Sequence, residues 1–182
     1  AVGERVVHRD YVRVIEAGGD ARLVEEHGAE LLFLGEVGED ALDHQQLLEA
    51  LLTGIYDLDI GCRVGDFLVT DRALLPGECR EAPGDEQLFV AAEGDELCMS
   101  LYLDPVLLER LDRHDPSENL DAGNLADCWT ALEGVSHFLC VAHHAGHDRP
   151  VSRLTLELQA ELDKYVASFL LIAGFMRMVG KI

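Results

Sequence analysis

Hydrophobic and polar residues alternate over much of the first hundred positions, as expected for strands that bury one face. Val12 and Val14 precede a turn at residues 18–20, and Leu23 follows it, which predicts a β-hairpin. Gly94 and the aspartate after it predict a second hairpin turn. The further strands predicted by alternation cover residues 30–37, 63–71, 87–93 and 96–104.

The hydrophobic period changes to that of a helix in two regions. Between residues 40 and 54, four leucines form one stripe that begins after Asp40 and ends at Gly54, which predicts a helix inserted among the strands. After Asp104 and Pro105, a capping residue followed by a proline, the chain becomes helical. Three helices are predicted there, over about residues 105–114, 124–146 and 152–179.

Segregation of strands and helices favours an α+β fold over an alternating α/β fold. We expect a mostly antiparallel sheet with one inserted helix, followed by three C-terminal helices. No segment of biased composition divides the chain, so we expect a single domain over residues 1–182, strand-rich over 1–103 and helical over 104–182.

The chain is strongly acidic, with 35 acidic and 14 basic residues and a net charge of −21. This charge argues against nucleic-acid and anionic-membrane partners, and it suits a cation, a basic partner or simple solubility. The uncharged run over residues 165–176 is shorter than the ~20 residues that span a bilayer. The five cysteines form no CxxC motif and no signal-peptide pattern is seen, so we expect reduced thiols and a cytoplasmic location.

Residues 133–148 hold four of the eight histidines and raise the question of a metal site. On a helical wheel, Glu133, His137, Cys140 and His144 fall on one line, and these residue types are common ligands of zinc. If the last two helices pack antiparallel, Glu157 and Glu161 could complete the site.

The four-residue line lies opposite the apolar side of its own helix, where Val135, Phe138, Leu139 and Ala142 form the predicted core face. Ligands in metal-binding bundles point inward instead. Two interpretations stay open. The line is a solvated polar face, or a second layer of the protein covers it.

Recognised catalytic motifs are not found: the chain has no H-E-x-x-H, no G-x-S-x-G and no phosphate-binding G-K-[ST]. We therefore expect a non-enzymatic binding or regulatory domain that needs no cofactor. The apolar residues 169–176 predict a homodimer or a protein partner. The alternative is a small metal-dependent enzyme or metal sensor, which would hold a divalent transition metal such as zinc on the Glu133, His137, Cys140 and His144 line.

Overall fold

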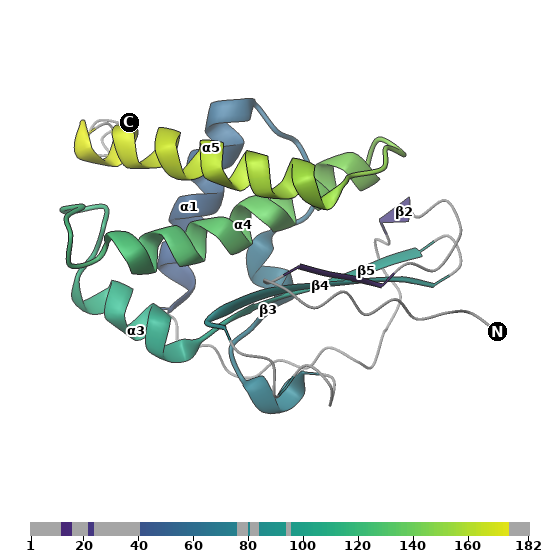
Figure 1. Cartoon of the computed structure of the whole chain (residues 1–182), viewed down its shortest axis with the longest axis horizontal. Coiled ribbons are helices and arrows are strands. Elements are labelled where there is room, and N and C mark those ends of the chain that lie inside the picture. Colours follow the sequence, from purple (N-terminus) through teal and green to yellow (C-terminus); the bar gives the residue numbers. More distant parts are fainter. Residues whose placement is uncertain are drawn as a thin grey trace.

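A helical layer covers one face of a mixed sheet in the computed structural model (Figure 1). The structure describes residues 12–15, 22–23, 41–75, 80, 84–93 and 96–174. It is an α+β arrangement, as expected from the sequence. The predicted strand at residues 30–37 and the end of the last predicted helix, beyond residue 174, lie outside the described residues.

The centre of the sheet is an antiparallel pair, β4 (Glu86–Glu93) and β5 (Glu96–Leu103), with Glu86 opposite Leu103. Strand β1 (Val12–Ile15) lies parallel to β4. Strands β2 (Arg22–Leu23) and β3 (Leu68–Val69) both lie parallel to β5, on its other side.

Two of the sheet predictions need correction. The strands on either side of residues 18–20 do not pair with each other, because β1 pairs with β4 and β2 with β5. The sheet is also not mostly antiparallel: among the described strands, only the β4–β5 pairing is antiparallel and three pairings are parallel. The long central strands offer more backbone partners and apolar surface than a local hairpin of short strands, so distant pairing prevails.

The predicted inserted helix is α1 (Ala41–Tyr56), and the three predicted C-terminal helices are α3 (Pro105–Arg113), α4 (Leu125–Ala145) and α5 (Arg153–Ile172). The carboxylate of Asp104 caps α3 by accepting a 2.8 Å hydrogen bond from the backbone N–H of Val106. The predicted strand at residues 63–71 is instead mostly a 3₁₀ turn, η1 (Val64–Phe67), followed by the short β3.

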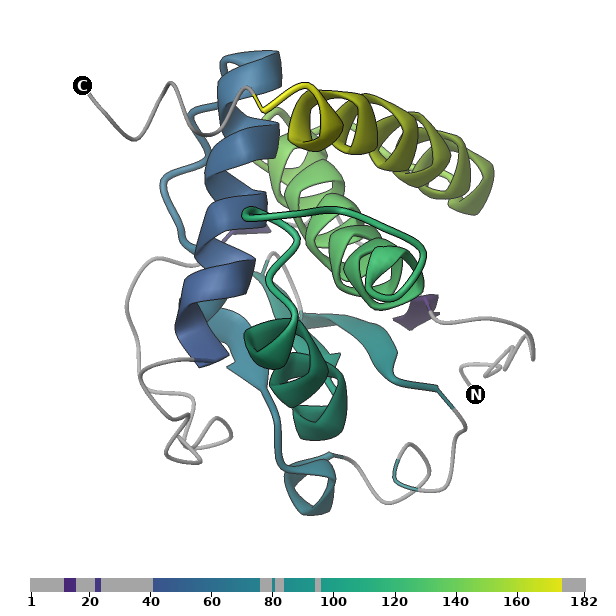
Figure 2. The same cartoon turned by 90° about the vertical axis from the view of Figure 1, so that its left-hand side faces the viewer.

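Helix α4 is the centre of the fold. It packs on β4 and β5 beneath it and on α5 above it (Figure 1). Helices α1 and α3 flank it on one side (Figure 2). Every residue over 134–139 is buried, so α4 is covered on all sides there. The histidine line is therefore covered at His137, which favours the covered interpretation there, whereas the side chain of Glu133 at the edge of this run is still 23 % exposed.

One hydrophobic cluster joins the sheet to the helices, with Leu88 and Leu101 from the strands and Leu132 and Phe138 from α4. Among the residues that the structure describes, no helix combines the length and the apolar character needed to cross a bilayer.

Candidate metal centre

The candidate site lies where the start of β4 meets the middle of α4. Residues of one strand alternate between two faces, so Glu86 shares the helix-facing side of β4 with the buried Leu88 and Val90. Glu86 itself is only 2 % exposed. An acidic side chain thus occupies the first of three core positions on this strand.

Gly134 lets the strand approach the helix closely. A Cβ atom at this position would lie 2.7 Å from Cγ of Glu86 and 2.9 Å from Cδ1 of Leu101. Both neighbours are buried, so neither could move aside without disturbing the core. The absence of a side chain at Gly134 therefore lets the carboxylate of Glu86 lie against the helix. Glu133, one position before Gly134, and His137, one turn after it, are its neighbours there.

Three potential ligands meet at this point. One ligand atom each from Glu86, Glu133 and His137 lie within 4.8 Å of one another. His137 is 1 % exposed, and neither of its ring nitrogens has a hydrogen-bond partner. Oε1 of Glu86 is also buried without a partner. Leaving a buried polar atom unsatisfied costs about 1–3 kcal/mol, so this convergence is costly unless it binds something.

Helix α5 contributes charges around the three residues. Nζ of Lys164 lies 2.5 Å from a carboxylate oxygen of Glu133 and 2.9 Å from one of Glu161. Glu157 lies close enough to act electrostatically on both Glu86 and His137. Lys164 thus balances part of the negative charge of the cluster, chiefly that of Glu133.

Burial determines the protonation of the two deepest groups. It raises the pKa of Glu86 well above its usual value, and the negative charges of Glu133 and Glu157 raise it further, while Lys164 opposes them. Burial lowers the pKa of His137, although Glu133 and Glu157 act in the opposite direction. At neutral pH the imidazole of His137 is therefore uncharged, which is the form that binds metals.

Cys140 and His144, the other two residues of the predicted line, form a separate pair further along α4. Sγ of Cys140 lies 3.7 Å from Nδ1 of His144. The same Nδ1–H donates a 2.9 Å hydrogen bond to the backbone carbonyl of Cys140. Burial, followed by the charge of Asp163, raises the pKa of the Cys140 thiol to about 11, so this sulfur is protonated at neutral pH.

The structure therefore divides the predicted residues. Glu133 and His137 join the three-residue cluster, whereas Cys140 and His144 contact each other. Glu157 lies near the cluster, and Glu161 contacts it only through Lys164, with its own side chain 72 % exposed. The four-residue line as a single site remains a prediction.

Sequence reasoning missed Glu86. The available signal was its register, because positions 86, 88 and 90 share one strand face and the other two are apolar. A second signal was Gly134. Glycine destabilises the interior of a helix, so its presence there suggests that a neighbouring segment approaches closely. Neither signal identifies which helix lies opposite the strand.

A second polar cluster joins three helices around the buried Asp163 of α5, which is 2 % exposed. Tyr56 of α1 donates a 2.5 Å hydrogen bond to this carboxylate, and Ser136 of α4 donates one of 2.6 Å. Gln159 donates a third, at 2.9 Å. Both carboxylate oxygens are thus bound within the protein, which makes this cluster structural.

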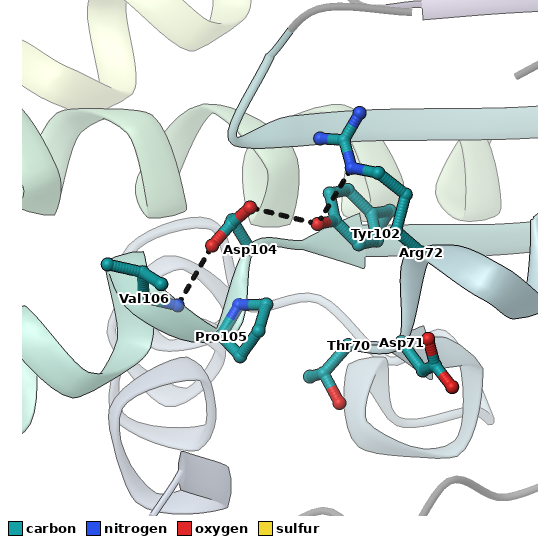
Figure 3. Close-up of a pocket in the computed structure, with 7 residues that line it drawn as sticks. All are labelled: Thr70, Asp71, Arg72, Tyr102, Asp104, Pro105 and Val106. Atoms are coloured by element: carbon teal, nitrogen blue, oxygen red, sulfur yellow. Dashed lines mark hydrogen bonds between the residues drawn. The ribbon is translucent and has the colours of Figure 1, made fainter. Parts of the chain in front are cut away.

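A surface cleft of about 520 Å³ lies beside β5 and the start of α3 (Figure 3). Arg72 donates a 3.2 Å hydrogen bond to the hydroxyl of Tyr102, which donates one of 3.0 Å to Asp104 (Figure 3). Three polar side chains of this cleft, Arg72, Tyr102 and Asp104, are therefore linked to each other. Its lining residues are Thr70, Asp71, Arg72, Tyr102, Asp104, Pro105 and Val106, so the three-residue cluster takes no part in it.

Compared with known proteins, the chain matches no family model, no curated protein sequence and no solved structure.

Proposed function

We propose that this protein is a binding or regulatory domain that holds a divalent transition metal, such as zinc, on Glu86, Glu133 and His137. The observation that carries the proposal is His137, which is 1 % exposed and has two unpartnered ring nitrogens beside two carboxylates. Imidazole and carboxylate are ligands that zinc and related metals accept together.

A metal ion would satisfy several groups of the cluster at once. It would accept the lone pairs of His137 and of both carboxylates. Its charge would displace the proton that the raised pKa of Glu86 favours, and would then offset the repulsion between Glu86 and Glu133. Ligand atoms around a tetrahedral zinc lie about 3.3 Å apart, given bond lengths near 2.0–2.1 Å. The ligand atoms, which lie within 4.8 Å of one another, would have to move together by up to about 1.5 Å to reach that spacing.

The surroundings favour binding over catalysis. The cluster lies between the sheet, α4 and α5, and its two deepest residues are at most 2 % exposed. A substrate in the cleft beside β5 would not contact the metal, because the cleft and the cluster share no residue. A metal held there would act on the packing of β4, α4 and α5, as in a structural or sensing site.

The test is zinc binding by the full chain after removal of metal with a chelator. Calorimetry and elemental analysis should find a single zinc per chain with micromolar or tighter affinity. Glu86→Gln and His137→Gln should each weaken binding by about 10–100-fold or more, the loss typical when a metal site is disturbed. Circular dichroism would check that each variant is folded.

Three control variants separate this site from the predicted line. Glu161→Gln removes a carboxylate that also binds Lys164 but lies outside the cluster, and it should leave the affinity unchanged. Cys140→Ser and His144→Gln should also retain zinc. If these two variants lose zinc and Glu86→Gln retains it, the zinc site is instead the line on α4 that includes Cys140 and His144. A wild-type chain that binds no zinc would overturn the proposal.

A further inference from the structure

Helix α5 has two apolar faces, of which the protein itself covers one. Leu156, Ala160, Ala167 and Leu171 are buried against the rest of the fold. The opposite face carries six large apolar side chains, each 50–73 % exposed. We call these the outer stripe: Leu154, Leu158, Leu162, Tyr165, Phe169 and Ile172.

The outer stripe is regular. Its members follow each other at intervals of three or four residues along the whole helix, so they lie within about 80° of arc on one side. An amphipathic surface helix normally has charged or polar residues on the side opposite its core face. None of the six positions carries a charge. The sequence of α5 is therefore that of a helix packed on both sides.

The exposed apolar area is large enough for a stable interface. With about 200 Å² for a whole side chain of this size, the exposed fractions correspond to roughly 800 Å². The largest apolar patch on a typical monomer is about 300–600 Å². A standard protein–protein interface buries about 800 Å² from each partner. The outer stripe alone thus exposes about as much area as one partner buries in a standard interface.

We propose that a second copy of this chain covers the outer stripe, with α5 packed antiparallel on α5 about a two-fold axis near residues 163–164. The stripe is self-complementary in this arrangement. Leu162 would lie opposite Tyr165 of the second copy, Leu158 opposite Phe169, and Leu154 opposite Ile172. The two-fold axis repeats each contact, as in a closed dimer.

Charge favours the antiparallel direction. The acidic residues that flank the stripe, Glu157 and Glu161, both lie in the N-terminal half of α5. An antiparallel pair places these two acidic halves at opposite ends of the interface. A parallel pair would bring four carboxylates together, each already paired with Arg153 or Lys164 of its own chain, and would also align the two helix dipoles. Both effects disfavour the parallel direction.

The first test is sedimentation velocity of the full chain across the micromolar range. We expect a dimer, and we expect Leu162→Glu to raise its dissociation constant by roughly 100-fold, as at a buried interface centre. The matched control is Val106→Glu, which places the same charge at an exposed apolar residue of α3, 51 % exposed and outside the stripe. This variant should remain dimeric.

The second test determines the direction of the pair. Leu158→Cys and Phe169→Cys chains are mixed, oxidised and mapped by mass spectrometry. An antiparallel pair forms the disulfide between position 158 of one chain and position 169 of the other. Disulfides between identical positions would overturn the antiparallel arrangement. A wild-type chain that stays monomeric, or a dimer unaffected by Leu162→Glu, would overturn the proposal and assign the stripe to a partner of another kind. Zinc binding by such a monomer would leave the proposed function intact.

Discussion

Replacement of Asp163 by alanine tests whether one buried carboxylate holds three helices together. The side chain belongs to α5 and accepts hydrogen bonds from Tyr56 of α1, Ser136 of α4 and Gln159 of its own helix. Tyr56 and Gln159 are partly exposed and can turn to water, whereas Ser136 is 2 % exposed. Most of the lost stability should therefore come from the contact between α4 and α5, where the hydroxyl of Ser136 would lose its hydrogen-bond partner.

The magnitude follows from that difference. A hydrogen bond to a charged group contributes about 1.5–3 kcal/mol, and a buried hydroxyl left without a partner costs about 1–3 kcal/mol. With little lost at the two partly exposed donors, Asp163→Ala should lower the free energy of unfolding by about 3–5 kcal/mol. Asp163→Asn keeps the size and one acceptor oxygen, so it should cost about half as much.

Urea denaturation followed by circular dichroism measures these costs on the metal-free chain, with an unchanged m-value as the check on two-state unfolding. The Ser136→Ala variant and the double variant complete a mutant cycle, whose coupling energy should be about 1–3 kcal/mol. A cost below about 1 kcal/mol for Asp163→Ala, or a coupling energy near zero, would refute the reasoning.

Two further predictions concern Gly134 and Tyr56. Gly134→Ala places a Cβ atom 2.7 Å from Cγ of Glu86, so it should cost about 1–3 kcal/mol in urea denaturation and weaken zinc binding. The control is Gly54→Ala in α1, where an added Cβ atom would have no neighbour within 4 Å. This variant should stabilise the chain by about 0.8–1 kcal/mol, because alanine favours a helix more than glycine does. Equal effects of the two variants on stability would contradict the packing argument. Burial, followed by the hydrogen bond to Asp163, raises the pKa of Tyr56 to about 12 from 10.0, so the folded state binds this proton more tightly than the unfolded state. The contribution of this proton to stability is therefore fully present below pH 10 and is lost as the pH rises toward 12. The Tyr56→Phe variant should lose less stability than the wild-type chain over that range. Phenol absorbance of the folded chain in which every tyrosine titrates near 10 would contradict this prediction.

Local sequence signals correctly predicted the helices and the β4–β5 pairing, because these elements form between residues that are close together in the chain. The capping aspartate and proline at residues 104–105 start α3, and hydrophobic periodicity locates α1, α4 and α5. The glycine–aspartate signal at residues 94–95 correctly predicted that β4 and β5 pair antiparallel. The same reasoning failed at residues 18–20, because β1 pairs with Leu88 to Ala91, more than seventy residues away. Turn residues do not encode such distant pairing.

The sequence by itself determined that Glu133 and His137 share one side of a helix, because a helix repeats every 3.6 residues whatever surrounds it. It also determined the two apolar faces of α5. Only the tertiary structure decided that the line on α4 is covered at His137, that Glu86 completes the cluster, and that Cys140 and His144 stay apart from it. The reason is physical: Glu86 reaches the helix through the packing of β4 against Gly134, a contact between residues 48 positions apart that no local pattern specifies.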